Sequence, residues 1–389
     1  MIPFARIVKY GNVLKNVGMK QISTIGLGHM FLTQDGELYV YGKDTYGRFG
    51  SGFKGTDDIT SLKLIRSDVQ NMWNTLSYTI ILTTDGKYMA SGLLVSYGVP
   101  DSTVFVDISS LFAQVPNISQ LVVDAATSTS YAGMMAVLDT NGDCWMVGAN
   151  SRYQFGNNTA TPSIGVFLKI MSGVKEIVGN HSGVSWCFLK NDNTLYTTGG
   201  NVFTSGAENR TPLLLASGVL KAVMIAGRGV MYVKGDKKLY TRGYMVGAYG
   251  STSTDVKEAA ITTTPFVYNY DTDIIRYDPF SQVYAGTIIL WNVATQKWYT
   301  GGTLGMNRMG TTVSSGGGWY EMRGDLPAPN DVLFVSGGSY NSNIISSPDG
   351  AMHTCGAYNG NGTLPGSQLV NYPAGYQTST EYIISRFAV

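Results

Sequence analysis

The sequence predicts an all-β protein, a seven-bladed β-propeller of four-stranded antiparallel blades that occupies residues 1–389 as a single domain. Three observations predict this fold. An eight-residue pattern ending in glycine occurs seven times along the chain. Its copies begin 44 to 59 residues apart, a period typical of propellers and solenoids. Most copies open with Asp or Asn beside turn residues that join two short strands into a hairpin.

The first copy, residues 35–42, defines the pattern. We expect strands at His29–Thr33 and Glu37–Tyr41, joined by a tight primed turn at Asp35-Gly36. The glycine that ends the pattern is present in all seven copies, so we expect positive φ or a close backbone approach there. The later copies begin at Asp85, Asn141, Asp192, Asp236, Thr295 and Asp349.

Further strands flank each hairpin. The strands expected before the hairpins of units two to five are Asp68–Trp73, Gln120–Asp124, Val174–Val178 and Leu220–Ile225. Segments between units, such as Gly165–Ile170 and Leu213–Ala216, supply a fourth strand. Four short strands cannot bury both faces alone, so a radial arrangement of units is favoured. We expect Phe4–Lys9 and Glu381–Phe387 to close the ring in a shared blade.

Composition excludes several classes of function. The net charge is +1 and only 14% of residues are charged, which predicts neither nucleic-acid binding nor attraction to an anionic membrane. The N-terminal residues lack a signal peptide, and no apolar run is long enough to cross a bilayer. The three cysteines have no metal-site spacing, so Cys144 and Cys355 are interpreted as buried hydrophobes. We expect no metal and no cofactor.

No catalytic motif is present, which predicts that the protein is not an enzyme. The three histidines are assigned structural roles: His29, His181 and His353. The Arg323-Gly324-Asp325 tripeptide could bind integrins, but is interpreted as a solvated turn. Asp271, Asp273 and Asp278 could bind calcium, although their spacing does not match an EF-hand loop.

The loops that follow the repeated glycine carry the binding hypothesis. They are rich in Gly, Ser, Thr, Asn and Tyr with isolated Arg, a composition typical of adaptable protein-binding loops. It is also the composition of ordinary polar propeller loops. Because all seven follow the same strand, they emerge on one side of the disc. The residues predicted to carry binding are Tyr46, Arg48, Arg152, Tyr153, Tyr244, Arg308 and Tyr358.

The units resemble repeats of the regulator of chromosome condensation family, whose members form seven-bladed propellers. The first unit matches its pattern at Gly26, His29, Leu32, Asp35, Gly36, Tyr39, Gly42, Gly47, Phe49 and Gly50. The third unit matches at Leu138, Gly142, Trp145, Gly148, Asn150, Gln154, Phe155 and Gly156. Tyr41 and Val147 replace the family's tryptophan before glycine. One unit, around Trp298 and its double glycine, is instead similar to a kelch blade.

Two functional hypotheses follow for a non-enzymatic, macromolecule-binding propeller. The first is a bacteriophage tail adhesin, assembled in the host cytoplasm into the virion. It would bind a protein or glycan receptor on a bacterial surface and contact other tail proteins. The low charge, the absence of a disulfide framework and the loop composition favour this reading. The second, implied by the family resemblance, is an intracellular scaffold or an exchange factor for a small GTPase. A glycan-acting enzyme ranks third.

Overall fold

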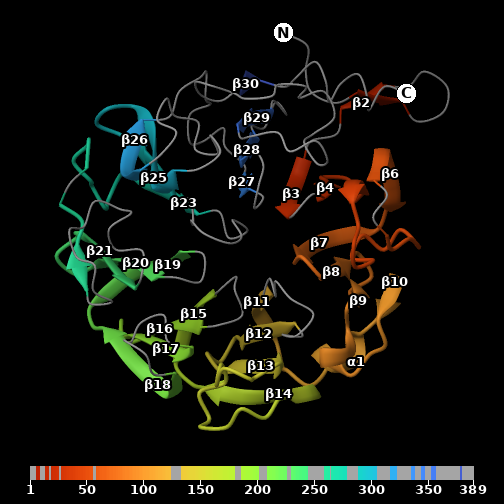
Figure 1. Cartoon of the computed structure of the whole chain (residues 1–389), viewed down its shortest axis with the longest axis horizontal. Helices are drawn as coiled ribbons and strands as arrows, with labels where there is room; N and C mark the ends of the chain where they lie inside the picture. Colours follow the sequence, from red (N-terminus) through yellow and green to blue (C-terminus); the bar gives the residue numbers. More distant parts are fainter. Residues whose placement is uncertain are drawn as a thin grey trace.

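The computed structural model describes part of the chain, in the following ranges: residues 6–8, 14–16, 19–25, 28–55, 58–123, 133–179, 185–200, 208–225, 229–243, 258–262, 264–277, 288–304, 316–321, 334–337, 343–346, 352–355 and 377–378. These residues form seven four-stranded antiparallel sheets and one two-stranded sheet. The four-stranded sheets are arranged radially around a central axis (Figure 1). The prediction of an all-β propeller with four-stranded antiparallel blades is confirmed.

Each blade takes its four strands from one continuous stretch of chain. The first strand of each blade lies next to the axis, as Figure 1 shows: β3 (Met19–Ile25), β7 (Val69–Asn74), β11 (Ile118–Val123), β15 (Val174–Gly179), β19 (Val219–Ile225), β23 (Ile274–Tyr277) and β27 (Phe334–Gly337). The second strands are β4 (Gly28–Thr33), β8 (Tyr78–Thr83), β12 (Met134–Asp139), β16 (Ser185–Lys190), β20 (Gly229–Lys234), β24 (Ile288–Asn292) and β28 (Asn343–Ser346).

The third strands complete the repeated hairpins: β5 (Leu38–Lys43), β9 (Tyr88–Gly92), β13 (Cys144–Gly148), β17 (Leu195–Gly199), β21 (Leu239–Gly243), β25 (Lys297–Leu304) and β29 (Met352–Cys355). The outer strands are β6 (Asp58–Arg66), β10 (Ser102–Asp107), β14 (Ser163–Met171), β18 (Asn209–Ala216), β22 (Ala259–Ala260), β26 (Gly316–Glu321) and β30 (Gln377–Thr378). Two short helical segments, η1 (Val95–Tyr97) and α1 (Ser109–Phe112), flank β10.

The hairpin turn differs in type from the prediction. Thr33 accepts a hydrogen bond from Gly36 N at 3.1 Å, and Thr33 N donates to Glu37 O at 2.9 Å. Only Gly36 has positive φ in this turn, +86°, whereas a primed turn of type I′ needs two such residues. The connection is therefore a type I turn followed by one left-handed residue. Later hairpins repeat it: Gly86 and Gly142 take the left-handed position in β8–β9 and β12–β13, and Asn193 and Lys237 take it in β16–β17 and β20–β21.

The core lies between the faces of neighbouring blades. One apolar cluster joins Met30 and Val40 of the first blade to Met72 and Ile81 of the second. Similar clusters fill the next four interfaces between blades. Cys144 and Cys187 are fully buried in these clusters, which confirms the hydrophobe interpretation for Cys144. Cys355 lies in β29, and its side chain is outside the described part.

Glutamine side chains connect the inner strands of neighbouring blades. A bulge near the start of β11, between Ile118 and Gln120, interrupts the regular pairing with β12. Gln120 Nε2 donates to Ile177 O, and Ile177 N donates to Gln120 Oε1, both at 2.9 Å. Gln21 occupies the same position in β3 and accepts from Met72 N at 2.9 Å. A side-chain amide thus satisfies backbone groups that a blade edge would otherwise expose.

The N-terminal part of the closure prediction is wrong. A strand exists within Phe4–Lys9, namely β1 (Arg6–Val8), but it pairs with β2 (Leu14–Asn16) in a separate sheet. This sheet lies at the rim of the ring (Figure 1). The first and last blades each hold four strands of their own, and β27 contacts β3 directly. Residues 381–387 lie outside the described part of the chain.

Candidate functional site

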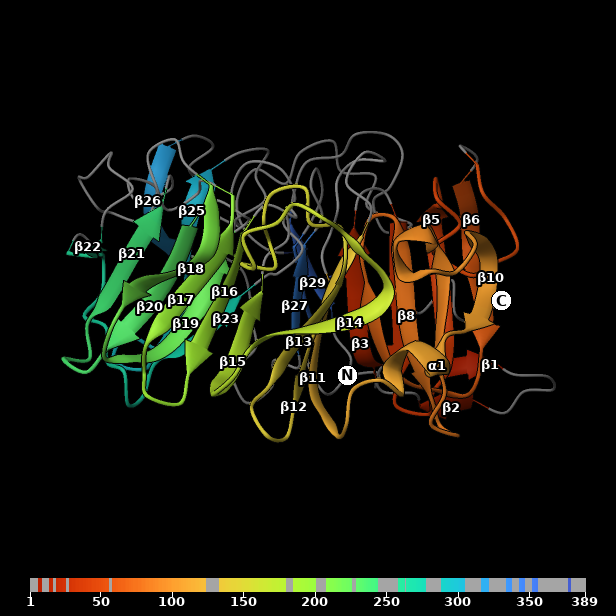
Figure 2. The same cartoon turned by 90° about the horizontal axis from the view of Figure 1, so that it is seen from below.

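The connections after the third strands leave the blades at the end opposite the hairpin turns (Figure 2). The connection after β5 is ordered by its first loop residue, Asp44. Its carboxylate accepts from Arg48 N at 2.8 Å and from Phe49 N at 3.0 Å. The connection after β13 repeats this fold, because Asn150 Oδ1 accepts from Phe155 N at 2.9 Å. The likeness of these two loops in sequence is therefore a likeness in structure.

Each of these loops is fastened to the next blade by a hydroxyl group. Ser91 Oγ donates to Arg48 O at 2.7 Å, and Thr198 Oγ1 donates to Gln154 O at 2.5 Å. Both hydroxyl residues directly precede the glycine that ends their own repeat. The loops are thus held between two blades, and such support keeps exposed side chains in place for recognition.

Arg48, one of the residues that the sequence predicts to carry binding, is buried in the structure. Its side chain is only 2% exposed, and its Nη1 donates to Thr75 O at 2.9 Å. Burial lowers the pKa of Arg48 to about 10, while Asp44 opposes the shift. Burial also raises the pKa of Asp44, against the backbone N–H groups and Arg48 that favour its anion. Arg48 therefore connects two blades inside the protein.

The loop after β13 presents an exposed cluster that we name the Tyr153 cluster: Arg152, Tyr153, Glu208 and Arg210. Arg152 Nη1 pairs with Glu208 Oε1 at 3.0 Å. The Arg210 guanidinium lies over the Tyr153 ring, 4.6 Å from its centroid. Arg152 and Arg210 are exposed, and Tyr153 and Glu208 are partly buried. Because the two arginines come from different blades, the cluster bridges a blade boundary.

Tyr153 has an unusual backbone conformation. Its φ is +59°, in the left-handed region that favours glycine. The equivalent residue of the loop after β5 is Gly47, with φ +77°. A bulky residue in this region is a genuine outlier that invites a functional explanation. The strain places an aromatic ring on the surface where the sister loop has no side chain.

The remaining predicted binding residues are not brought together in the described part. Tyr46 is partly buried in the loop after β5. Tyr244, Arg308 and Tyr358 lie outside the described residues. Arg210 and Glu208 are not among the predicted site residues. Their role depends on a contact across a blade boundary, which sequence spacing does not reveal.

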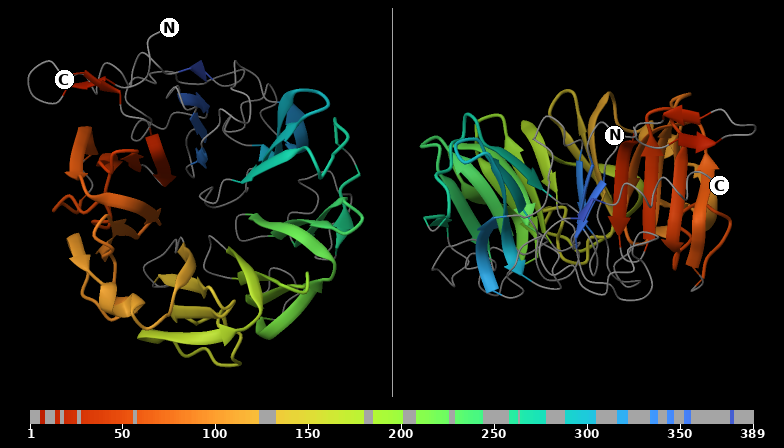
Figure 3. Two further views of the ribbon diagram at one scale, coloured as in Figure 1. Left: turned by 180° about the vertical axis from the view of Figure 1, so that it is seen from behind. Right: turned by 90° about the horizontal axis from the view of Figure 1, so that it is seen from above.

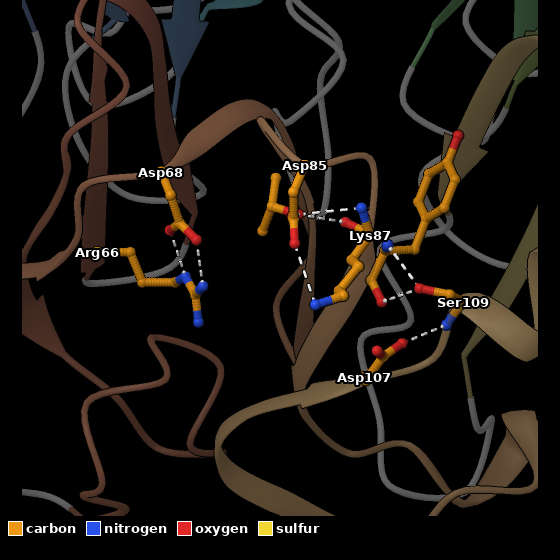
Figure 4. A network of polar contacts seen from close by, with 8 residues as sticks. Arg66, Asp68, Asp85, Lys87, Asp107 and Ser109 are labelled. Carbon is orange, nitrogen blue, oxygen red and sulfur yellow. Dashed lines mark hydrogen bonds and ion pairs between the residues drawn. The ribbon is translucent and has the colours of Figure 1, made fainter.

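The opposite face carries a charged network at the hairpin end of the second blade (Figure 4). Arg66 donates from Nε to Asp68 Oδ1 at 2.8 Å, and Lys87 pairs with Asp85 at 3.0 Å. Hydrogen bonds from Arg66 lower the pKa of Asp68. The Lys87–Asp85 pair is exposed and the Arg66–Asp68 pair is partly exposed, so solvent screens both and they add little to stability. We assign this network no recognition role.

Other candidates from the sequence take part in local structure or lie outside the described part. His29 is fully buried in β4 and stacks on Phe31, with ring centroids 6.2 Å apart. Asp273 accepts from Asn292 Nδ2 and from Val293 N, while Asp271 pairs with Lys237. His181, Asp278 and the 323–325 tripeptide are outside the described residues. Within the described part, no cluster of metal-binding side chains occurs, and no helix is long and apolar enough to span a membrane.

Comparison with known proteins supports the fold through structure alone. No family model matches the sequence, and no curated protein matches it. Human WBSCR16 is similar in structure, with a TM-score of 0.60 and 12% identity over 84% of this chain and 86% of that one. Prp20p of Saccharomyces cerevisiae, described with its binding to Gsp1p and histones, gives 0.55 and 15% over 82% and 80%.

A second structure, of yeast RCC1 (Prp20) with Kap60, gives a TM-score of 0.57 and 13% identity over 90% of this chain and 86% of that one. At such low identity these likenesses show a shared propeller fold. They agree with the propeller fold that the family resemblance implied. Seen from behind, the blades of this chain stand in a ring, and seen from above the ring is viewed edge-on (Figure 3).

Proposed function

We propose that this protein is a non-enzymatic propeller that binds a partner protein on its loop-bearing face, with the Tyr153 cluster at the centre of the contact. One observation carries the proposal: Tyr153 occupies a left-handed backbone position that its sister loop gives to Gly47. Such a conformation costs a bulky residue about 1–3 kcal/mol. Binding energy gained by the ring would offset that cost.

The composition of the cluster fits this role. Tyrosine and arginine are enriched among the few residues that dominate binding energy at protein interfaces. The Arg210 guanidinium over the ring and the hydroxyl of Thr198 behind the loop limit the motion of these side chains. Groups that are already ordered lose less entropy on binding.

The similar structures favour a protein partner over a bacterial receptor. Prp20p was described with Gsp1p and histones, and the second yeast structure contains Kap60. A scaffold or an exchange factor for a small GTPase, as the family resemblance implies, is therefore the better-supported reading. The comparisons give no support to the virion adhesin, its glycan receptor or its tail partners.

The test compares two tyrosine variants in affinity capture from cells of the source organism. Tyr153→Gly removes the ring and relieves the backbone, so it is expected to fold at least as stably as the wild type. It should weaken capture of the partner about tenfold or more, a change of ~1.4 kcal/mol in affinity. Tyr196→Ala is the matched control, since Tyr196 also lies beside a cation, Lys190, at 5.7 Å, away from the loops.

Four outcomes separate the readings. Partner capture that Tyr153→Gly abolishes and Tyr196→Ala preserves supports the proposal. Faster nucleotide release from a captured GTPase identifies an exchange factor. Binding to intact bacteria, with no captured protein, favours the adhesin and overturns the proposed function, as does equal capture by both variants.

A further inference from the structure

Arg210 is one of the two exposed arginines of the Tyr153 cluster. Within the described part of the chain, no carboxylate forms an ion pair with it. Its neighbour Glu208 pairs with Arg152 at 3.0 Å. The Arg210 backbone is fixed at the start of β18, where its carbonyl accepts from Asn158 N at 2.8 Å. The side chain meets Tyr153 through the face of the ring. The exposed guanidinium of Arg210 therefore lies over the Tyr153 ring, and its backbone is held by a hydrogen bond.

A guanidinium that lies over a ring keeps its N–H donors available in its own plane. These donors form a fork that matches the two oxygens of a carboxylate. Arg48 of the sister loop offers no such donor, because it is buried and hydrogen-bonded to Thr75 O. Recognition here would therefore be local, which agrees with a net charge of only +1.

We infer that Arg210 and Tyr153 bind an acidic segment of the partner protein, with a glutamate or aspartate carboxylate on Arg210 and the adjoining side chain against the tyrosine ring. This inference rests on the proposed function and specifies the chemistry of its partner. Glu208 sets the selectivity of the site, because it neutralises Arg152 and disfavours a second carboxylate nearby. One acidic group flanked by apolar or neutral residues fits the cluster better than a dense run of charge.

The experiment measures binding of fluorescent peptides to the full-length protein by anisotropy. The probe is a short peptide with one glutamate between leucine and tyrosine, and its matched control has glutamine instead. The wild type should bind the glutamate peptide at least tenfold more tightly than the glutamine peptide. Arg210→Gln should remove that preference, and Arg210→Lys should restore only part of it, because lysine lacks the planar fork.

Lys87→Gln serves as the protein control, since Lys87 lies in the charged network of the opposite face (Figure 4). It should leave peptide binding unchanged. Glu208→Gln should raise affinity for the glutamate peptide, as one repulsive carboxylate is removed. Inorganic phosphate and free glutamate are added separately as competitors, which distinguishes a phosphate site from a carboxylate site.

The inference is overturned if the wild type does not distinguish the two peptides at concentrations up to about 1 mM. It is also overturned if Arg210→Gln and Lys87→Gln bind alike, or if phosphate displaces the peptide at a lower concentration than free glutamate does. Partner capture that needs Tyr153 but not Arg210 would leave the proposed function standing while rejecting the carboxylate.

Discussion

Replacing Gly148 by alanine tests why glycine ends every repeat. Gly148 closes β13 with φ +111°. A Cβ atom added there would lie 2.2 Å from Gly133 O and 3.0 Å from Met134 Cα, both backbone atoms of the paired strand region. Backbone cannot turn aside as a flexible side chain can. The strands would have to separate at the pair that Met134 and Gly148 form.

The expected cost has two parts. The positive φ costs alanine about 1–3 kcal/mol, and a disturbed ladder hydrogen bond adds about 1 kcal/mol. Gly148→Ala should therefore reduce the free energy of unfolding by roughly 2–4 kcal/mol. Gly86→Ala is the matched control, because Gly86 has φ +83° but no atom within 4 Å of the added Cβ. It should lose only the strain, about 1–2 kcal/mol.

Urea unfolding of both variants measures the difference. Any entropic gain from removing a glycine from the unfolded chain applies to both and cancels. Equal losses of stability in the two variants would refute the close-approach argument and leave only the preference for positive φ.

Two further predictions concern the contacts between inner strands. Gln120→Leu leaves Ile177 N and O without the side-chain amide that binds them. Chemical denaturation should therefore show a loss of about 1–3 kcal/mol in the free energy of unfolding. A change within ~0.5 kcal/mol, as for ordinary surface residues, would contradict this prediction. Burial raises the pKa of Glu176, with Lys221 and Lys175 opposing, so the folded state binds the proton more tightly and stability falls as pH rises through the raised pKa. Glu176→Gln should therefore have a higher melting temperature than the wild type at pH 7 and nearly the same melting temperature at pH 4. An equal difference at both pH values would show that the raised pKa of Glu176 does not affect stability.

Periodicity made the blades predictable, because each hairpin repeats turn residues and a terminal glycine whose chemistry is local. The turn type was wrong for a local reason as well: Asp35 and Gly36 allow a primed turn, but only Gly36 adopts positive φ. The sequence did not predict the bulges in the inner strands or the glutamine contacts between blades. Gln120 and Ile177 are 57 residues apart, and nothing in either segment specifies the other.

Loop composition predicted the site only in part. Tyr46, Arg48, Arg152 and Tyr153 have similar neighbours in sequence, yet the structure buries Arg48 and exposes Arg152. Arg48 stands at the position that the buried Gln154 occupies in the sister loop, and its guanidinium donates to Thr75 O of the next blade. Burial of a long polar side chain is decided by tertiary contacts that a single loop sequence does not contain.

The continuity of each blade has a consequence for how the chain reaches its native state. Every four-stranded sheet in the described part is made from one unbroken segment, so its hydrogen-bond ladder depends on no distant residue. Synthesis can therefore complete one sheet before the next is made, with contacts that are local in sequence and fast to form. Within the described residues, the contact of β27 with β3 brings early and late parts of the polypeptide together. New termini placed between two blades, with the old ones joined by a linker, would leave every ladder intact.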